Sequence, residues 1–213
     1  HEKAVADGVN VGNEVYVIET RISQAGAQIK AQQQVERREK LTRKKRWEQQ
    51  DEDEAYSATQ LDRAIVNPDQ IRTVIRTFRD QLPEIFPGRQ EVPKTLIFAK
   101  TDSHADDIIQ IVREVYAQGN AFCKKVTYKA EEDPDSILAG FRNDYHPRIA
   151  VTVDMIATGT DVKPLEVLLF MRDVRSRNYY EQMKGRGVRS LSFDDLRRVS
   201  NSADSAKTRF ALI

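Results

Sequence analysis

The chain has 213 residues, of which 31% are charged and 39% hydrophobic, and its formal net charge is +1. A single cysteine, Cys123, excludes an internal disulfide framework, and no apolar run approaches the roughly 20 residues of a membrane-spanning helix. The composition predicts a soluble intracellular protein, in which any contact with nucleic acid comes from local clusters of cations.

The first 60 residues predict a strand followed by a charged extension. Residues 14–22 (EVYVIETRI) alternate β-branched or aromatic residues with polar ones, which predicts a half-buried strand. Residues 28–56 lack glycine and proline and carry acid–base pairs at i,i+4 spacing, which predicts a charged helical arm. The basic run at 37–46, followed by acidic residues at 48–54, fits either a solvated helix or an arm that contacts nucleic-acid phosphates.

From residue 61 to residue 213 the pattern predicts one domain in which strands alternate with helices. Apolar residues at helical spacing predict helices over 69–81, 103–118 and 134–141, and one from about residue 178. Short apolar runs predict strands over 94–100, 123–128, 148–153, 166–171 and 208–213. Pro83 and Pro87 are expected to end the first helix, and Ser103 and Gly119 to begin and close the second.

This alternation predicts an α/β fold, with a parallel sheet covered by helices on both faces. Ligands of such sheets bind at the carboxyl ends of the strands, here the loops after Ala99, Val153 and Met171. Because the chain opens with His1 rather than Met and stops inside an apolar segment, we expect a fragment of a longer polypeptide. The sequence contains no phosphate-binding G-x-x-x-x-G-K-[ST] loop and no metal-ligand spacing, so no self-sufficient active site is expected.

The strongest candidate site is the segment 182–189 (QMKGRGVR). Arg186 and Arg189 lie three residues apart, and Gly185 and Gly187 allow close approach of the backbone. Between residues 172 and 189 there are six cations and two acids, and two guanidinium groups suit a polyphosphate. The alternative is an ordinary cationic surface or a salt-bridged turn.

A second candidate is the segment 154–161 (DMIATGTD), which follows the predicted strand 148–153. It places carboxylates at the ligand edge of the sheet, where Asp161 can accept from a sugar hydroxyl and the loop amides can bind a phosphate. The alternative is that Asp154 caps the following turn.

These segments resemble the conserved motifs of superfamily 2 helicases. QMKGRGVR resembles motif VI, VTVDMIATGTDV resembles motif V and KTLIFAKTDSHADDI resembles motif IV, and the three occur in the family's order. The chain is therefore similar to the second RecA-like domain of such motors. LTRKKRWEQ, PDQIRTVIRTFRD and DMIATGTDVKPLE narrow the resemblance to the motor (R) subunit of bacterial type I restriction enzymes, which couple ATP hydrolysis to translocation of double-stranded DNA.

The resemblance implies a role for each matching residue. Catalytic contacts with the γ-phosphate are implied for Gln182, Arg186 and Arg189; nucleotide contacts for Gly159, Asp161 and Gly185; DNA contacts for Lys100, Thr101 and Thr158. Met183 and Val153 differ from the residues that RNA helicases often carry at these positions. This weakens the resemblance to RNA helicases but not the resemblance to the type I restriction motor subunit.

The resemblance also implies cofactors and partners. ATP and Mg²⁺ are bound mainly by a first RecA-like domain, which with a nuclease domain precedes this region in the family; no metal site is expected in this chain. The implied partners are double-stranded DNA and the modification and specificity subunits, in the bacterial cytoplasm. The chain alone is predicted to be inactive as an ATPase. The competing hypothesis is a non-catalytic DNA-binding or subunit-docking module with the same fold.

Overall fold

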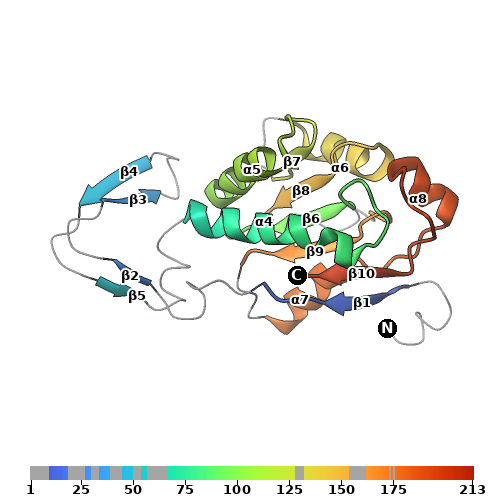
Figure 1. Cartoon of the computed structure of the whole chain (residues 1–213), viewed down its shortest axis with the longest axis horizontal. Helices are drawn as coiled ribbons and strands as arrows, with labels where there is room; N and C mark the ends of the chain where they lie inside the picture. Colours follow the sequence, from blue (N-terminus) through green and yellow to red (C-terminus); the bar gives the residue numbers. More distant parts are fainter. Residues whose placement is uncertain are drawn as a thin grey trace.

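A six-stranded parallel sheet forms the centre of the molecule, with strand order β1-β10-β9-β6-β8-β7 (Figure 1). The computed structural model describes residues 10–18, 27–29, 34–38, 45–49, 54–56, 67–127, 132–153, 162–172, 174 and 176–213. The strands are β1 (Gly12–Val15), β6 (Thr95–Phe98), β7 (Cys123–Lys125), β8 (Ile149–Thr152), β9 (Val167–Phe170) and β10 (Arg209–Leu212). The helices are α4 (Pro68–Ile85), α5 (Asp102–Tyr116), α6 (Pro134–Asn143), α7 (Arg177–Lys184) and α8 (Phe193–Val199).

Helices cover both faces of this sheet, which confirms the predicted parallel α/β arrangement. Ile97 and Leu169 point toward α4 and α5 in one buried cluster. Their neighbours along the strands, Leu96 and Leu168, belong to a second cluster with residues of α6 and α7. Because alternate residues of β6 and β9 are buried on opposite faces, these strands are apolar throughout, as the sequence shows.

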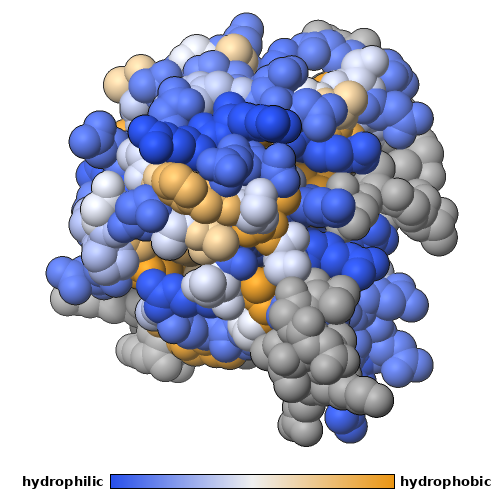
Figure 2. All heavy atoms as spheres, turned by 90° about the vertical axis from the view of Figure 1, so that its right-hand side faces the viewer, coloured by the Kyte–Doolittle hydropathy of each residue, from blue (hydrophilic) through white to orange (hydrophobic). Residues whose placement is uncertain are grey.

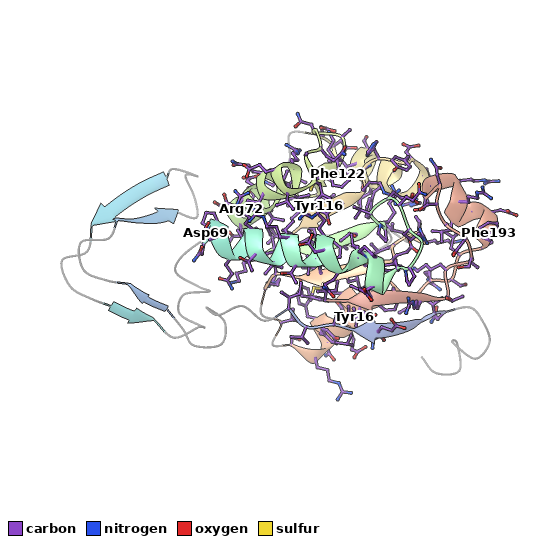
Figure 3. All side chains as sticks on the ribbon, viewed as in Figure 1. Tyr16, Asp69, Arg72, Tyr116, Phe122 and Phe193 are labelled. Carbon is purple, nitrogen blue, oxygen red and sulfur yellow. The ribbon has the colours of Figure 1, made fainter. Side chains whose placement is uncertain are left out.

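Helices α4 and α5 lie side by side on one face. Arg72 of α4 and Glu114 of α5 form an ion pair of 2.6 Å. At the same end of α5, the rings of Tyr116 and Phe122 have centroids 5.2 Å apart (Figure 3 labels Arg72, Tyr116 and Phe122). No helix in the described part of the chain combines the length and apolarity of a membrane span.

The N-terminal strand is an edge strand of the main sheet. Gly12 pairs with Arg209, and Val15 with Leu212, in a parallel register. The Arg209 guanidinium also donates to the Glu14 carboxylate at 2.5 Å, and this bond holds the pKa of Glu14 below its usual value. The strand predicted over 14–22 is therefore confirmed only at residues 14 and 15: β1 begins at Gly12 and ends at Val15, residues 16–18 are not in a strand, and residues 19–22 lie outside the described residues. The domain boundary near residue 60 stays a prediction.

The helical arm predicted over 28–56 is wrong, because the structure forms strands there. β3 (Gln34–Arg38) pairs antiparallel with β4 (Lys45–Gln49), and β2 (Ala27–Ile29) with β5 (Glu54–Tyr56). An i,i+4 ion pair contributes only about 0.2–0.5 kcal/mol, and a helix without an apolar stripe gains little from packing. Local charge pairs were therefore too weak to decide the conformation. Part of the basic run, residues 39–44, lies outside the described residues.

Several predicted helix ends are also corrected. Helix α4 continues through Pro83 to Ile85, because Leu82 and Ile85 are buried and hold the last turn in the core. Helix α5 is capped by Thr101, whose hydroxyl accepts from the His104 N–H at 3.1 Å, and not by Ser103. It closes with Ala117 in the left-handed region at φ 50° rather than with Gly119. Helix α8 was not predicted.

Candidate functional site

The two candidate arginines follow the end of helix α7. Ser176 caps this helix by accepting from the Tyr179 N–H at 3.3 Å, and Met183 anchors it in the core. The chain then tightens into a turn, in which the Arg186 N–H donates to the Met183 carbonyl at 3.1 Å. We call residues 185–189 the arginine turn.

Gly187 lets the arginine turn pack directly on the core. A Cβ atom at this position would lie 2.5 Å from the Phe210 ring, which is fully buried on β10. Gly185 is different: it has helical angles, and an added Cβ would meet the carbonyl oxygens of its own chain at 3.2–3.3 Å. The close approach expected from the sequence is therefore present at Gly187, toward the protein's own ring.

Neighbouring strands fix the backbone of the arginine turn at the amino edge of the sheet. The Val11 N–H, just before β1, donates to the Val188 carbonyl at 2.7 Å, and Arg189 forms an antiparallel bridge with Asn10. The Lys207 ammonium, just before β10, donates to the Gly187 carbonyl at 2.7 Å. The arginine turn is thus held by residues at the starts of two strands.

The candidate side chains at the end of α7 and on the arginine turn reach the surface. Gln182 and Arg189 are exposed and Arg186 is half-buried. Figure 2 faces the end of the molecule that carries α8, and the surface there is mostly hydrophilic with smaller apolar patches. A guanidinium on a fixed backbone at such a surface can donate to phosphate oxygens of a ligand or partner.

Below this surface, the amino edge contains charged side chains that are almost completely buried. These side chains belong to residues just before strands: Lys94, Arg148 and Glu166 directly precede β6, β8 and β9, and Lys207 lies two residues before β10. The Lys94 ammonium donates to the carbonyls of Asp144, Tyr145 and Pro147 at 2.6–3.1 Å. Burial, together with nearby Arg148, lowers the pKa of Lys94 to about 7.

Arg148 and Glu166 complete this buried network. The Arg148 guanidinium donates to the Val92 carbonyl at 2.8 Å, to the Val199 carbonyl and to the Ser200 hydroxyl at 2.9 Å, which ties α8 to the sheet. Glu166 accepts from Arg89 at 2.6 Å. Burial raises the pKa of Glu166, and the charges of Arg89 and Lys207 oppose that shift.

Two other candidate residues, Lys100 and Thr101, lie at the carboxyl edge. Lys100 and Thr101 follow β6, where the Lys100 N–H donates to Nδ1 of His104 at 3.2 Å. Lys125, at the end of β7, forms ion pairs of 2.8 Å with Asp102 and Asp106, in the first two turns of α5. These contacts fix the start of α5 and the position of Thr101.

The structure therefore separates the candidate residues into two groups, at opposite edges of the sheet. Lys100 and Thr101 lie at the carboxyl edge, as expected, but the arginine turn lies at the amino edge. Thr158, Gly159 and Asp161 lie outside the described residues. The chain enters their segment after β8, at the carboxyl edge, and leaves it before β9, at the amino edge.

Sequence reasoning missed the buried cations, above all Lys207. A lysine just before an apolar strand normally indicates an exposed flank, and no spacing or motif distinguishes Lys207 or Lys94 from such residues. Among the residues that the structure describes, no group of three or more His, Cys, Asp or Glu side chains is placed to hold a metal ion.

Comparisons with known proteins give one family and several relatives. The family of helicase conserved C-terminal domains matches residues 68–190. The endonuclease subunit of the type I restriction enzyme EcoKI from Escherichia coli strain K12 is 31% identical over 147 residues, which cover 65% of this chain and 12% of that protein. The corresponding EcoAI subunit from Escherichia coli is 26% identical over 144 residues, which cover 65% of this chain and 17% of that protein.

A solved structure shares the fold. It is a fragment of a protein described as the HsdR subunit of a type I restriction enzyme from Vibrio vulnificus. Its TM-score is 0.51 at 20% identity, and the match covers 68% of this chain and 27% of that one. The chain spans less than a fifth of the length of the two curated relatives.

Proposed function

Because the chain belongs to the family of helicase conserved C-terminal domains and is similar to type I restriction enzyme endonuclease subunits, we propose that it is a motor domain. It is the second RecA-like domain of an ATP-dependent translocase and endonuclease subunit of a type I restriction-modification system. It acts on double-stranded DNA in the bacterial cytoplasm. Its partners are the first RecA-like and nuclease domains of the same protein and the modification and specificity subunits.

The observation that carries this proposal is the fixed backbone of the arginine turn. A charge-stabilising arginine accelerates phosphoryl transfer only if it is held in place before the reaction. Gly187 rests on Phe210, and strand residues bind the carbonyls of Gly187 and Val188. Arg186 therefore projects from a backbone that two strands hold, which favours a catalytic role over a freely moving surface cation.

The residues of the arginine turn fit a triphosphate by their chemistry. Guanidinium groups donate in pairs to phosphate oxygens and stay charged at any physiological pH. ATP with Mg²⁺, held mainly by the first RecA-like domain, supplies the energy for translocation. Arg186 and Arg189 stabilise charge on the transferring phosphoryl group, and Gln182 with Gly185 contacts the same nucleotide.

DNA contacts are proposed at the opposite edge of the sheet. Thr101 and Lys100 precede a 15-residue helix, whose first N–H groups and backbone dipole favour a phosphate of the tracked strand. Thr158 is proposed to contact the same strand, while Gly159 and Asp161 relate the DNA to the nucleotide. Segment 154–161 follows β8, which ends at the carboxyl edge, and precedes β9, which begins at the amino edge, so it links both groups of contacts along the chain.

The test uses full-length protein in the complex with its modification and specificity subunits. Arg186→Ala and Arg189→Ala are each expected to lower DNA-stimulated ATP hydrolysis about 100-fold or more, with translocation lost in parallel. The control is Arg198→Ala on α8, an arginine whose side chain is 78% exposed and pairs with Asp195 at 3.4 Å. It should keep turnover within about twofold, because surface ion pairs contribute little.

Near-normal turnover of Arg186→Ala and Arg189→Ala, with thermal unfolding unchanged, would contradict the catalytic role. Retained DNA binding in the same variants would then favour a non-catalytic DNA-binding or docking module.

A further inference from the structure

Lys207 is a buried lysine whose ammonium joins two separate segments of the chain. The residue is only 4% exposed. The ammonium donates to the Gly187 carbonyl at 2.7 Å and to the Lys163 carbonyl at 3.0 Å. The backbone N–H of Lys207 donates to the Leu191 carbonyl at 3.0 Å, so the backbone of this residue is fixed as well.

Both acceptor carbonyls stand next to proposed contact residues. Gly187 directly follows Arg186, and Lys163 comes two residues after Asp161. The Lys207 ammonium therefore connects the arginine turn to Lys163, in the segment that leads into β9 and that follows Gly159 and Asp161 along the chain. Hydrogen bonds from a charged donor are roughly twice as strong as neutral ones, and burial removes competing water.

Other contacts around the arginine turn make its position depend on this bond. Phe210 blocks the core side of Gly187, where there is no room for even one added carbon. Val11 holds the next carbonyl, that of Val188. Lys207 adds hydrogen bonds that relate this turn to the segment before β9, rather than to a neighbouring strand.

We propose that Lys207 is a positioning residue, which sets the geometry of the arginine turn, and so of Arg186, relative to the segment that leads from Lys163 into β9. The proposal rests on the function proposed above. Lys207 touches neither nucleotide nor DNA in this scheme; it acts by holding the arginine turn and the segment before β9 in one arrangement. Its loss misplaces a guanidinium that must meet a developing charge, and a shift of about 1 Å can cost about 100-fold in rate.

The chain offers a matched control in Lys94. Lys94 is also buried before a strand of the same sheet, and its ammonium also donates to backbone carbonyls. Those carbonyls belong to the segment between α6 and β8, away from the proposed contact residues. Lys94→Met and Lys207→Met thus remove similar interactions at different places.

The experiment measures kcat and KM for ATP, in DNA-stimulated hydrolysis by the full-length protein, together with thermal unfolding. Lys207→Met is expected to lower kcat about tenfold or more, with KM for ATP changed less than about threefold. Lys94→Met is expected to lower thermal stability comparably but to keep kcat within about twofold. In an Arg186→Ala background, Lys207→Met is expected to cause no further loss, because the residue through which it acts is gone.

Each other result contradicts the inference. If Lys207→Met keeps kcat within about twofold while Arg186→Ala loses activity, the inference fails and the proposed function stands. Losses that multiply in the double variant show that Lys207 acts independently of Arg186. In that case too, the inference fails and the proposed function stands. If Arg186→Ala is fully active, the proposed function itself fails. Should Lys207→Met not fold, Lys207→Gln, which keeps one shorter donor, is measured against the same limits.

Discussion

Replacing Gly187 with alanine tests the packing of the arginine turn. The added Cβ would lie 2.5 Å from one Phe210 ring atom and 2.8 Å from two others, whereas carbon atoms in contact prefer about 3.5–4.0 Å. The ring cannot retreat easily, because Phe210 is fully buried in the cluster with Leu168 and Met183. Either the ring or the turn must therefore move by about 1 Å.

Such overpacking costs about 1–3 kcal/mol. For a chain of this length, a loss of about 2 kcal/mol lowers the melting temperature by about 4–8 °C. We expect urea unfolding followed by far-UV circular dichroism to show this loss for Gly187→Ala. Gly185→Ala is the control, since Gly185 has helical angles and its added Cβ meets atoms no closer than 3.2 Å; its effect should stay below about 1 kcal/mol.

A double variant identifies the cause of the loss. Phe210→Leu removes the ring atoms that the new methyl group meets, so Gly187→Ala should cost at least about 1 kcal/mol less in that background. Equal stability of Gly187→Ala and the original chain would refute the reasoning, as would a cost that Phe210→Leu leaves unchanged.

Three further predictions concern charged residues. The pKa of Lys94 is about 7 in the folded chain and near 10.5 when unfolded, so the unfolded chain binds more protons between these values. The free energy of unfolding should therefore rise from pH 7 to pH 8.5, by at most about 1.4 kcal/mol per pH unit, and Lys94→Met should remove this rise. Arg148→Met should lower the free energy of unfolding by about 3–5 kcal/mol in urea titrations, because it leaves the buried carbonyls of Val92 and Val199 without their hydrogen-bond donor. A decrease below about 1 kcal/mol contradicts this. Changing Arg43, Lys44 and Lys45 to Glu tests whether the basic run contacts DNA. If the run is only solvated, the slope of log K against log salt for duplex binding should stay unchanged. If the run binds DNA, the slope should flatten by about 0.9 for each phosphate that the variant no longer neutralises.

The main sheet could be predicted from the sequence because its strands carry a strong local signal. Residues 95–98 and 167–170 are buried at nearly every position and almost entirely apolar, and only strands covered on both faces are expected to be so. The cap of α5 could not be chosen reliably, since Thr101 and Ser103 are both good capping residues two positions apart. Conformation over 28–56 was mispredicted because charge pairs at helical spacing do not reveal strand partners elsewhere in the chain.

The candidate site could likewise be predicted only in part from the sequence. Arg186 and Arg189 could be named as candidates because glycines and the resemblance to a known motif mark them in the sequence, and their role stays a prediction. Their location at the amino edge could not be found, because it depends on bonds from Val11 and Lys207, far away in the chain. A buried lysine is indistinguishable from an exposed one until the carbonyls around it are known.

The pairing of β1 with β10 has a consequence for how the molecule is made. Gly12 leaves the ribosome long before Arg209, its partner in the sheet, has been added to the chain. Until then β1 has no partner strand in the main sheet, and closing so long a loop is entropically costly. The four strands from β6 to β9 can assemble earlier, from segments much closer in sequence. During synthesis, Tyr16 and Ile18, which pack against the core of the folded domain, thus belong to an unpaired segment, which a chaperone that binds extended apolar chains would recognise before the domain closes.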